Sequence, residues 1–354
     1  MVTDDIASES VELLKAMIGI PSLSCGEKEV ADYLETQFTN WGLRPSRSGN
    51  NLWMRNKEWS DDKPVILLNS HIDTVRPASG WTYEPYKATV EEGRITGLGS
   101  NDAGASVVSL LGTFRYFYNA ASLPWNLLFC ASAEEEISGE NGVASILVQL
   151  GRIDLAIVGE PTQMQIAIAE KGLLVLDCEA KGRAGHAARN EGENAIYKAI
   201  KDIKILEAYR FPLESPVLGP VKMTVTQIEA GHQHNVVPDS CRFVVDVRTN
   251  EFYSNEEAFR IISGLIQSEV HPRSFRLNSS GISAEHPLVQ RGIEMGLSLY
   301  GSPTTSDQAV IPYPSIKMGP GDSARSHTAN EYILISEINE GIATYVKLLE
   351  ELKF

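Results

Sequence analysis

The stretch Val65–Asp73 (VILLNSHID) decides how the rest of this 354-residue sequence is interpreted. Its apolar first half predicts a strand buried on both faces, and its polar second half lies at the carboxyl end of that strand. Two further apolar runs, Leu127–Ala131 and Leu155–Val158, are separated from it and from each other by helical patterns near 104–119 and 140–150. Helices that alternate with continuous apolar strands predict an α/β layer with a mainly parallel sheet and flanking helices.

A second pattern interrupts this alternation after Pro161. Residues 165–280 show strand-like runs with two helices between them, an order typical of an α+β, ferredoxin-like unit. The residues that follow return to alternating helix and strand and end in a predicted helix near 336–352. We therefore expect residues 1–164 and 281–354 to form one domain into which residues 165–280 are inserted.

Composition limits the partners of the chain. The 31 Lys+Arg and 46 Asp+Glu residues give a net charge of −15, and without a long basic cluster this argues against nucleic acid or an anionic membrane as the main partner. No apolar run approaches the ~18–20 residues of a membrane span, and the acidic start Met1–Ser10 is unlike a secretory signal. The cysteines are scattered and form no CxxC pair: Cys25, Cys130, Cys178 and Cys241. We expect a cytoplasmic protein.

Acidic residues and histidines gather where the apolar strands end, which is the edge at which open α/β sheets bind ligands. His71 and Asp73 are two residues apart on an extended segment, so their side chains point the same way and the carboxylate can orient an imidazole that binds a metal. The loop Gly97–Gly104 (GLGSNDAG) lacks both the GxGxxG and the GK[ST] pattern of phosphate loops. Its Asp102 would repel phosphate but suits a cation.

Two more acidic stretches follow strands, and one histidine comes late in the chain. Cys130–Gly139 contains the adjacent acids Glu134, Glu135 and Glu136, which repel one another unless a cation or solvent separates them. Glu160 follows the third apolar run, and Gly319–Glu331 (GPGDSARSHTANE) contains His327. Each stretch alone is equally typical of a turn, a helix cap or a solvated acidic helix start. Their joint occurrence, in this order and at strand ends, is the strong signal.

Taken together, these motifs resemble the M20 metallopeptidase family, which includes acetylornithine deacetylases, succinyl-diaminopimelate desuccinylases, aminoacylases and carboxypeptidases. The resemblance covers essentially the whole chain and implies a dimetal catalytic domain with an inserted lid and dimerisation domain, hence a homodimer. It implies two divalent ions of the zinc type, for which cobalt or manganese can substitute. One ion would be bound by His71 and the other by His327, with Asp102 bridging both and one glutamate capping each. The implied ligands are His71, Asp102, Glu136, Glu160 and His327.

The resemblance also implies catalytic roles. Glu135 matches the general base, and Asp73 matches the residue that orients His71. The segment Gly185-His186-Ala187 matches the lid histidine, so that His186 would reach into the partner subunit's site. The family run more often reads Asp-Glu-Glu, whereas this chain has Glu134 at its first position.

Substrate-binding roles are implied for Asn235 and Arg248. Asn235 lies in a run that matches GG-x-x-x-N-x-x-P, although His232 replaces a common glycine, and Arg248 lies in a D-x-R match whose arginine usually contacts a substrate carboxylate. Leu98, where arginine is usual, and Ala103-Gly104, where Met-Lys is common, are further departures. They bear on the subfamily and not on the metal site.

Three side chains near these motifs keep open interpretations. The pair His232 and His234 has a spacing that can bind a metal, but the resemblance assigns no ligand there, so a lid-loop or substrate-facing role is favoured. Arg325 is either a second carboxylate contact or a plain surface arginine.

The expected activity is that of a metal-dependent amidohydrolase. We expect it to remove an acetyl or succinyl group from the small molecule N-acyl-L-ornithine in arginine biosynthesis, by attack of a metal-bridging water. The alternatives are a succinyl-diaminopimelate desuccinylase and an M20 dipeptidase or carboxypeptidase, because Arg248 would hold an α-carboxylate in all of them. The intact base and ligands argue against a non-catalytic relative, and the lack of G-x-S-x-G, HExxH and a complete phosphate loop argues against a serine hydrolase or nucleotide enzyme.

Overall fold

The computed structural model describes residues 4–353, so residues 1–3 and 354 of the predicted first domain lie outside the described part. The chain divides into two compact units. Unit 1 contains the chain up to Ile168, Gly281–Tyr300 and the residues from Ser306 onward, and unit 2 contains Ala169–Ser280 and Gly301–Thr305. The short segment Gly301–Thr305 joins unit 2 through the N–H of Lys171, which donates to the carbonyl of Ser302 at 3.0 Å.

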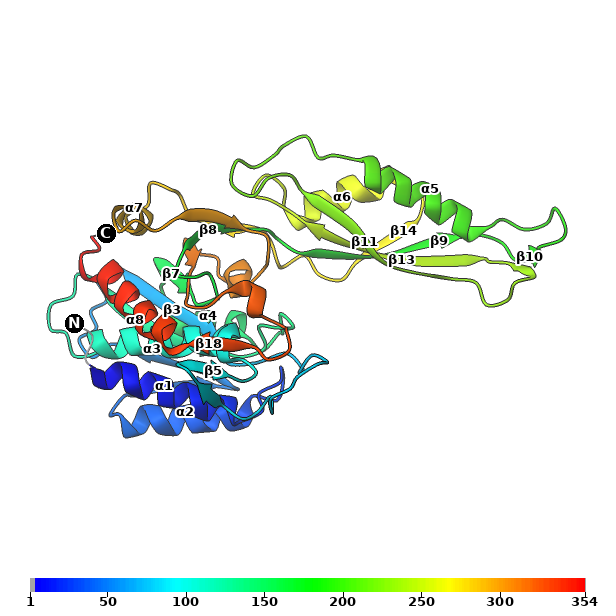
Figure 1. Cartoon of the computed structure of the whole chain (residues 1–354). Helices are drawn as coiled ribbons and strands as arrows, with labels where there is room; N and C mark the ends of the chain where they lie inside the picture. The colour runs from blue at the N-terminus through cyan, green and yellow to red at the C-terminus, as the bar shows by residue number, and fades with distance from the viewer. Residues whose placement is uncertain (1–3, 354) are drawn as a thin grey trace. The chain divides into compact units, whose positions relative to one another are not determined.

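A nine-stranded sheet forms the centre of unit 1, in the order β1-β2-β6-β3-β7-β17-β8-β15 with β16 beside β8 (Figure 1). Four central strands run parallel: β3 (Val65–His71), β6 (Asn126–Ser132), β7 (Leu155–Val158) and β17 (Ser315–Lys317). The other strands of this sheet are β1 (Ser46–Ser48), β2 (Asn51–Arg55), β8 (Ile166–Glu170), β15 (Ser280–Gly281) and β16 (Leu299–Ser302). Every residue of β3 and β6 is buried, which explains the apolar runs within them, and the four parallel strands confirm the predicted α/β layer with a mainly parallel sheet.

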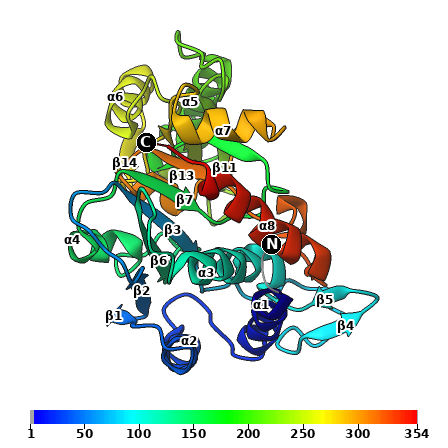
Figure 2. The same ribbon diagram turned by 90° about the vertical axis from the view of Figure 1, so that its left-hand side faces the viewer.

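Helices cover both faces of this sheet. The longer ones pack together on one face through a shared apolar cluster, and the short helix α4 lies on the opposite face (Figure 2). The helices of unit 1 are α1 (Asp4–Ile18), α2 (Lys28–Asn40), α3 (Ala105–Phe117), α4 (Leu147–Leu150), α7 (Pro287–Glu294) and α8 (Ile335–Glu350). Short helical turns are η1 (Ser100–Gly104), η2 (Val143–Ile146), η3 (Asp307–Val310) and η4 (Ser323–Arg325). Among the described helices, none combines the length and apolarity that a membrane crossing requires.

A small antiparallel sheet joins distant parts of the chain in unit 1. Its strands are β4 (Thr89–Glu91), β5 (Arg94–Thr96) and β18 (Tyr332–Leu334), with β5 in the middle. Thr96 pairs with Tyr332, so the loop that follows β5 lies beside the residues that precede β18. This pairing brings the Asp102 loop next to the segment that carries His327.

Unit 2 is an antiparallel sheet with helices on one face. The sheet has the order β11-β13-β9-β14 and consists of β9 (Leu174–Lys181), β11 (Lys222–Ala230), β13 (Ser240–Arg248) and β14 (Glu269–Pro272). Buried residues alternate along β9 and pack against α5 (Ala195–Ala208) and α6 (Asn255–Leu265). A separate two-stranded ribbon pairs β10 (Gly185–His186) with β12 (Val236–Val237). The alternation of strands and helices matches the α+β order that the sequence predicts.

Candidate active site

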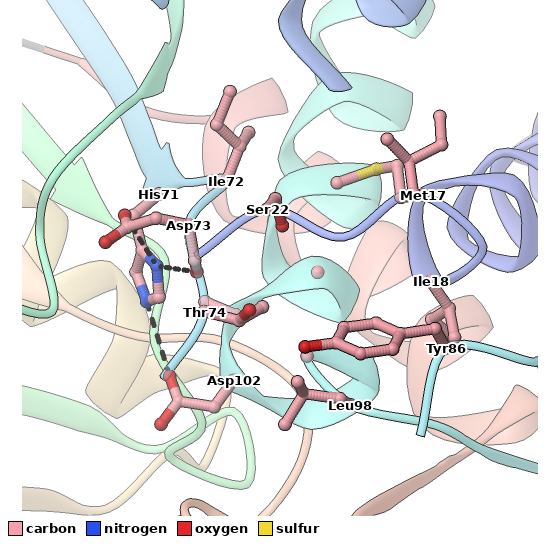
Figure 3. A pocket seen from close by; sticks show the side chains of 14 residues that line it. Met17, Ile18, Ser22, His71, Ile72, Asp73, Thr74, Tyr86, Leu98 and Asp102 are labelled. Atoms are coloured by element: carbon pink, nitrogen blue, oxygen red, sulfur yellow. Dashed lines mark hydrogen bonds and ion pairs between the residues drawn. The ribbon is translucent and has the colours of Figure 1, made fainter. Parts of the chain in front are cut away.

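The site is built around His71, the last residue of β3, which is 2% exposed. Its Nδ1 lies 2.9 Å from the main-chain oxygen of Asp73 and 3.5 Å from the carboxylate of that residue (Figure 3). Since a carbonyl only accepts, Nδ1–H donates, and Nε2 is directed toward carboxylates of other segments. The imidazole is thus oriented from behind by Asp73, with the main-chain oxygen as the nearest partner.

Asp102 faces two histidines at once. Its Oδ1 lies 3.3 Å from Nε2 of His71, and its Oδ2 lies 3.5 Å from Nε2 of His327. Each carboxylate oxygen therefore has its own imidazole, which is the arrangement of a carboxylate that bridges two cations. A cis peptide bond joins Asp102 to Ala103.

Two glutamates complete the groups on either side of Asp102. Nε2 of His327 lies 3.0 Å from Oε2 of Glu136, and Nε2 of His71 lies 3.7 Å from Oε1 of Glu160. Glu135 is also near, with Oε2 at 3.9 Å from Nε2 of His71. The distances thus define one group around each histidine, with Asp102 shared between them.

These separations fit ligands of common metal ions. Two donors bound to one zinc at its usual bond lengths stand about 3.4 Å apart in tetrahedral geometry. Two sets of residues offer ligand atoms that lie within 4.8 Å of one another, His71–Asp102–Glu136 and His71–Glu135–Glu160. Both sets contain His71 and neither contains His327, which lies 3.5 Å from Asp102 and 3.0 Å from Glu136. Imidazole nitrogen and carboxylate oxygen are donors that suit zinc and related divalent ions. The residues present therefore fit a dinuclear centre.

The pKa shifts of the site residues also favour bound cations. Burial raises the pKa of Glu135 well above its ordinary value and raises that of Glu160 to about 8, with Asp102 adding to the second shift. The hydrogen bond to Glu136 raises the pKa of His327 to about 9. Burial opposes protonation of His71, but the carboxylates around it outweigh burial and raise its pKa well above the usual range. Carboxylates this close and this buried require protons or cations between them.

The loop that carries Glu135 and Glu136 is held by carboxylates from elsewhere in the chain. Asp73 accepts the main-chain N–H of Glu135 at 3.0 Å and that of Glu136 at 3.1 Å. Glu27, which is fully buried, accepts the N–H of Glu134 at 3.2 Å. Sequence analysis missed Glu27, whose only signal is an S-x-x-E pattern just before a helix, typical of a helix cap.

Two more buried acids near the site were missed. Glu331 is 2% exposed and accepts main-chain N–H groups of the Asp102 loop, and burial raises its pKa to about 7. Asp307 accepts from the amide of Asn69 at 2.8 Å and from the hydroxyl of Ser132 at 2.7 Å. Burial raises the pKa of Asp307 to about 6. Glu331 lies in the quoted His327 segment, whereas Asp307 stands alone in sequence and gives no signal there.

The predicted residues of unit 2 form two separate groups. His186 is exposed on the β10–β12 ribbon, and the neighbouring Ala187 donates its N–H to the carbonyl of Asn235 at 3.0 Å. Arg248 donates to both carboxylate oxygens of Asp246, at 2.8 and 3.0 Å, and its Nη1 donates to the hydroxyl of Thr305 at 3.2 Å.

The residues with open interpretations belong to neither of these metal-type clusters. Of the clusters found in the described part of the chain, neither includes His232 or His234, and both histidines are exposed. Arg325 is bound within unit 1, because its Nη1 donates to Glu337 at 2.7 Å and its guanidinium lies 4.4 Å from the ring centre of Tyr332.

Imidazoles and carboxylates that converge at the carboxyl edge of a mainly parallel sheet define a dimetal hydrolase class of site. Comparison with known proteins gives the family. Residues 67–351 match the profile of peptidase family M20/M25/M40, and the chain belongs to this family. It is therefore a hydrolase that acts on amide bonds.

Several relatives align with most of this chain. The chain is 30% identical to the [LysW]-lysine/[LysW]-ornithine hydrolase of Sulfurisphaera tokodaii over 96% of this chain and 95% of that one. It is 24% identical to a succinyl-diaminopimelate desuccinylase of Corynebacterium glutamicum, over 98% of both chains. It is 25% identical to an acetylornithine deacetylase of Myxococcus xanthus, over 78% of this chain and 77% of that one.

Solved structures share the fold. A tripeptidase from Staphylococcus aureus superposes with a TM-score of 0.78 at 20% identity, with 98% of both chains covered. The YXEP protein of Bacillus subtilis, described as a dinuclear metal-binding peptidase of the M20 family, superposes with a TM-score of 0.72 at 16% identity and the same coverage.

Proposed function

We propose that this protein removes an acetyl or succinyl group from N-acyl-L-ornithine, the deacylation step of arginine biosynthesis. The observation that carries the proposal is the position of Asp102, whose two oxygens face two histidines. The carboxylate of Glu135 lies beside one of these histidines, 3.9 Å from Nε2 of His71. Ornithine derivatives are named among the substrates of two relatives. Both relatives share most of their length with this chain.

The residues divide into two ligand groups. His71 and Glu160 would hold one ion, His327 and Glu136 the other, and Asp102 both. We propose zinc, because the donors are imidazole nitrogen and carboxylate oxygen, and cobalt or manganese could replace it. Bound there, the ions would polarise the acyl carbonyl and lower the pKa of a water molecule.

Glu135 is the proposed general base. Its carboxylate is nearly buried beside His71, and its main chain is fixed by Asp73. It takes the proton of the attacking water and later delivers that proton to the departing amine nitrogen of ornithine. Burial raises the pKa of Glu135, and bound cations would lower it again, which would leave the carboxylate able to accept a proton.

Unit 2 supplies the proposed substrate contacts. Asp246 orients the guanidinium of Arg248, which would bind the α-carboxylate of the substrate in a charge-assisted hydrogen bond. His186 lies on β10 and Asn235 directly precedes β12, and the N–H of Ala187 donates to the carbonyl of Asn235, so a single movement of this ribbon would carry both. We propose that the ribbon acts in the partner subunit's site.

A homodimer through unit 2 is supported by its surface. Strand β11 is an edge strand of its sheet, and Ile228 on it is 56% exposed. Helix α5 exposes Tyr197 by 66% and Ile200 by 40%. An exposed edge strand with apolar side chains nearby is typical of a surface that pairs with another chain.

Amine release from N-acetylornithine, N-succinylornithine and N-succinyl-diaminopimelate, measured in parallel with added zinc, tests the proposed function. We expect turnover of one ornithine derivative, and the Glu135→Gln variant as control should be inactive on the same compound. Selective turnover of the diaminopimelate derivative would assign the alternative activity, to which the desuccinylase relatives point. No turnover of any of the three would refute the proposal and direct the search to dipeptides.

A further inference from the structure

Glu331 binds the main chain of the Asp102 loop with its whole carboxylate. Its Oε1 accepts the N–H of Asn101 at 2.9 Å and that of Asp102 at 2.8 Å, and its Oε2 accepts the N–H of Gly99 at 3.0 Å. The side chain is 2% exposed. A buried carboxylate is stable only where hydrogen bonds or cations replace its water shell, and these N–H groups provide that replacement.

Further contacts join the same two segments. The N–H of Gly97 donates to the main-chain oxygen of Glu331 at 3.0 Å. The amide of Asn101 donates to the carbonyl of Asp322 at 3.1 Å, and its Oδ1 accepts the N–H of Asp322 at 3.0 Å. The loop that ends in Asp102 is therefore fixed to the segment that contains His327, four residues before Glu331.

We propose that Glu331 is a positioning residue that holds the bridging carboxylate of Asp102 in register with His327, so that the two-ion site exists before the ions bind. The proposal rests on the proposed dimetal function. It explains why an acid and not an amide occupies this buried position, since three N–H donors converge on it and both oxygens must accept.

The proposed role of Glu331 is to keep the carboxylate of Asp102 aligned with both histidines. The oxygens of Asp102 must stay 3.3 and 3.5 Å from two histidines of different segments if each is to share an ion with its imidazole. In Glu331→Gln one oxygen becomes an NH2 group, which would face an N–H of the loop and push it away. Loss of a group that orients a metal ligand typically lowers metal affinity by about 10- to 100-fold, and we expect a loss of this size.

Zinc affinity and stoichiometry, measured by competition with a chromophoric chelator, test the proposal. The matched control is Asp202→Asn in unit 2, because Asp202 is also a buried carboxylate, 4% exposed, that accepts the N–H groups of Gln267 and Ser268. Both variants should lower the melting temperature of the metal-free protein. Only Glu331→Gln should weaken zinc binding. Wild-type zinc affinity and stoichiometry in Glu331→Gln would overturn the proposal.

Two further measurements cover a variant that does not fold. Glu331→Asp keeps the charge but is one methylene shorter, so it should fold and bind zinc more weakly than wild type; unchanged affinity would overturn the proposal. In the metal-free wild-type protein, hydrogen exchange of the peptide that contains residues 99–102 should be slow, and fast exchange would show that the loop is not held in advance. A wild-type protein that binds two zinc ions but hydrolyses no N-acylornithine would contradict the proposed function alone.

Discussion

Replacement of Asp73 by asparagine tests how the acidic loop is held. The Asp73 carboxylate accepts the N–H groups of Glu135 and Glu136 and the hydroxyl of Ser24, the last at 2.7 Å. Asparagine keeps one acceptor oxygen, so its NH2 group must face at least one of these N–H donors. Loss of one hydrogen bond to a charged group costs about 1.5–3 kcal/mol. If that energy is lost in the transition state, kcat/KM falls by about 10- to 150-fold.

The assay is steady-state hydrolysis of the preferred N-acyl amino acid at saturating zinc, with kcat and KM determined separately. Ser24→Ala is the matched control, because it removes one donor to the same carboxylate but leaves both N–H contacts that hold the acidic loop, so kcat/KM should fall less than in Asp73→Asn. Wild-type kcat/KM in Asp73→Asn would refute the reasoning. A loss that appears only at limiting zinc and is absent at saturating zinc would show that Asp73 acts only through metal binding.

Three further predictions concern the base, the charge and the assembly. Glu135→Gln should lower kcat by about 10²- to 10⁴-fold while two zinc ions still bind. Glu134→Gln, which alters the two hydrogen bonds from Asn141, should keep kcat, and equal losses would contradict the assigned base. The folded-state pKa of Glu160 is raised to about 8 and that of His327 to about 9, so folding favours the protonated form of both side chains. Their contribution to the free energy of unfolding is complete below about pH 4.3 for Glu160 and below about pH 6.5 for His327. It is lost as the pH rises through 8 for Glu160 and through 9 for His327. The melting temperature of chelator-treated protein should therefore fall between pH 5 and 9 and zinc should remove most of that fall; a rise without metal would contradict this. Mixed His186→Ala and Glu135→Gln subunits should regain activity, and proven heterodimers without activity would place both groups in one chain.

The central strands were predictable because strands buried on both faces have apolar residues at consecutive positions. Strands β3, β6 and β7 are covered on both faces, and this leaves unbroken apolar runs. The helix expected near 140–150 is instead the turn η2 followed by the four-residue helix α4. Val148 on α4 is apolar but 92% exposed.

The site was predictable only in part, because only some of its residues lie in sequence patterns that indicate their position. The carboxyl ends of parallel strands meet at one edge of a sheet, which brings together His71 at the end of β3, Glu136 after β6 and Glu160 after β7. Asp102 and His327 come together through the pairing of β5 with β18. Their roles as ligands stay predictions. No sequence pattern identifies the acids that hold loops through main-chain N–H groups. The partners of Glu331 are about 230 residues away in sequence, and no local pattern links them to it.

Turnover measured against the number of zinc ions per chain tests the central claim most directly. Chelator-treated protein would be titrated with zinc, and amine release from the preferred N-acyl amino acid would be followed at each step. The two ligand groups that share Asp102 predict no turnover without metal and a maximum at two ions per chain. Full turnover in protein proven free of metal would contradict the dimetal account.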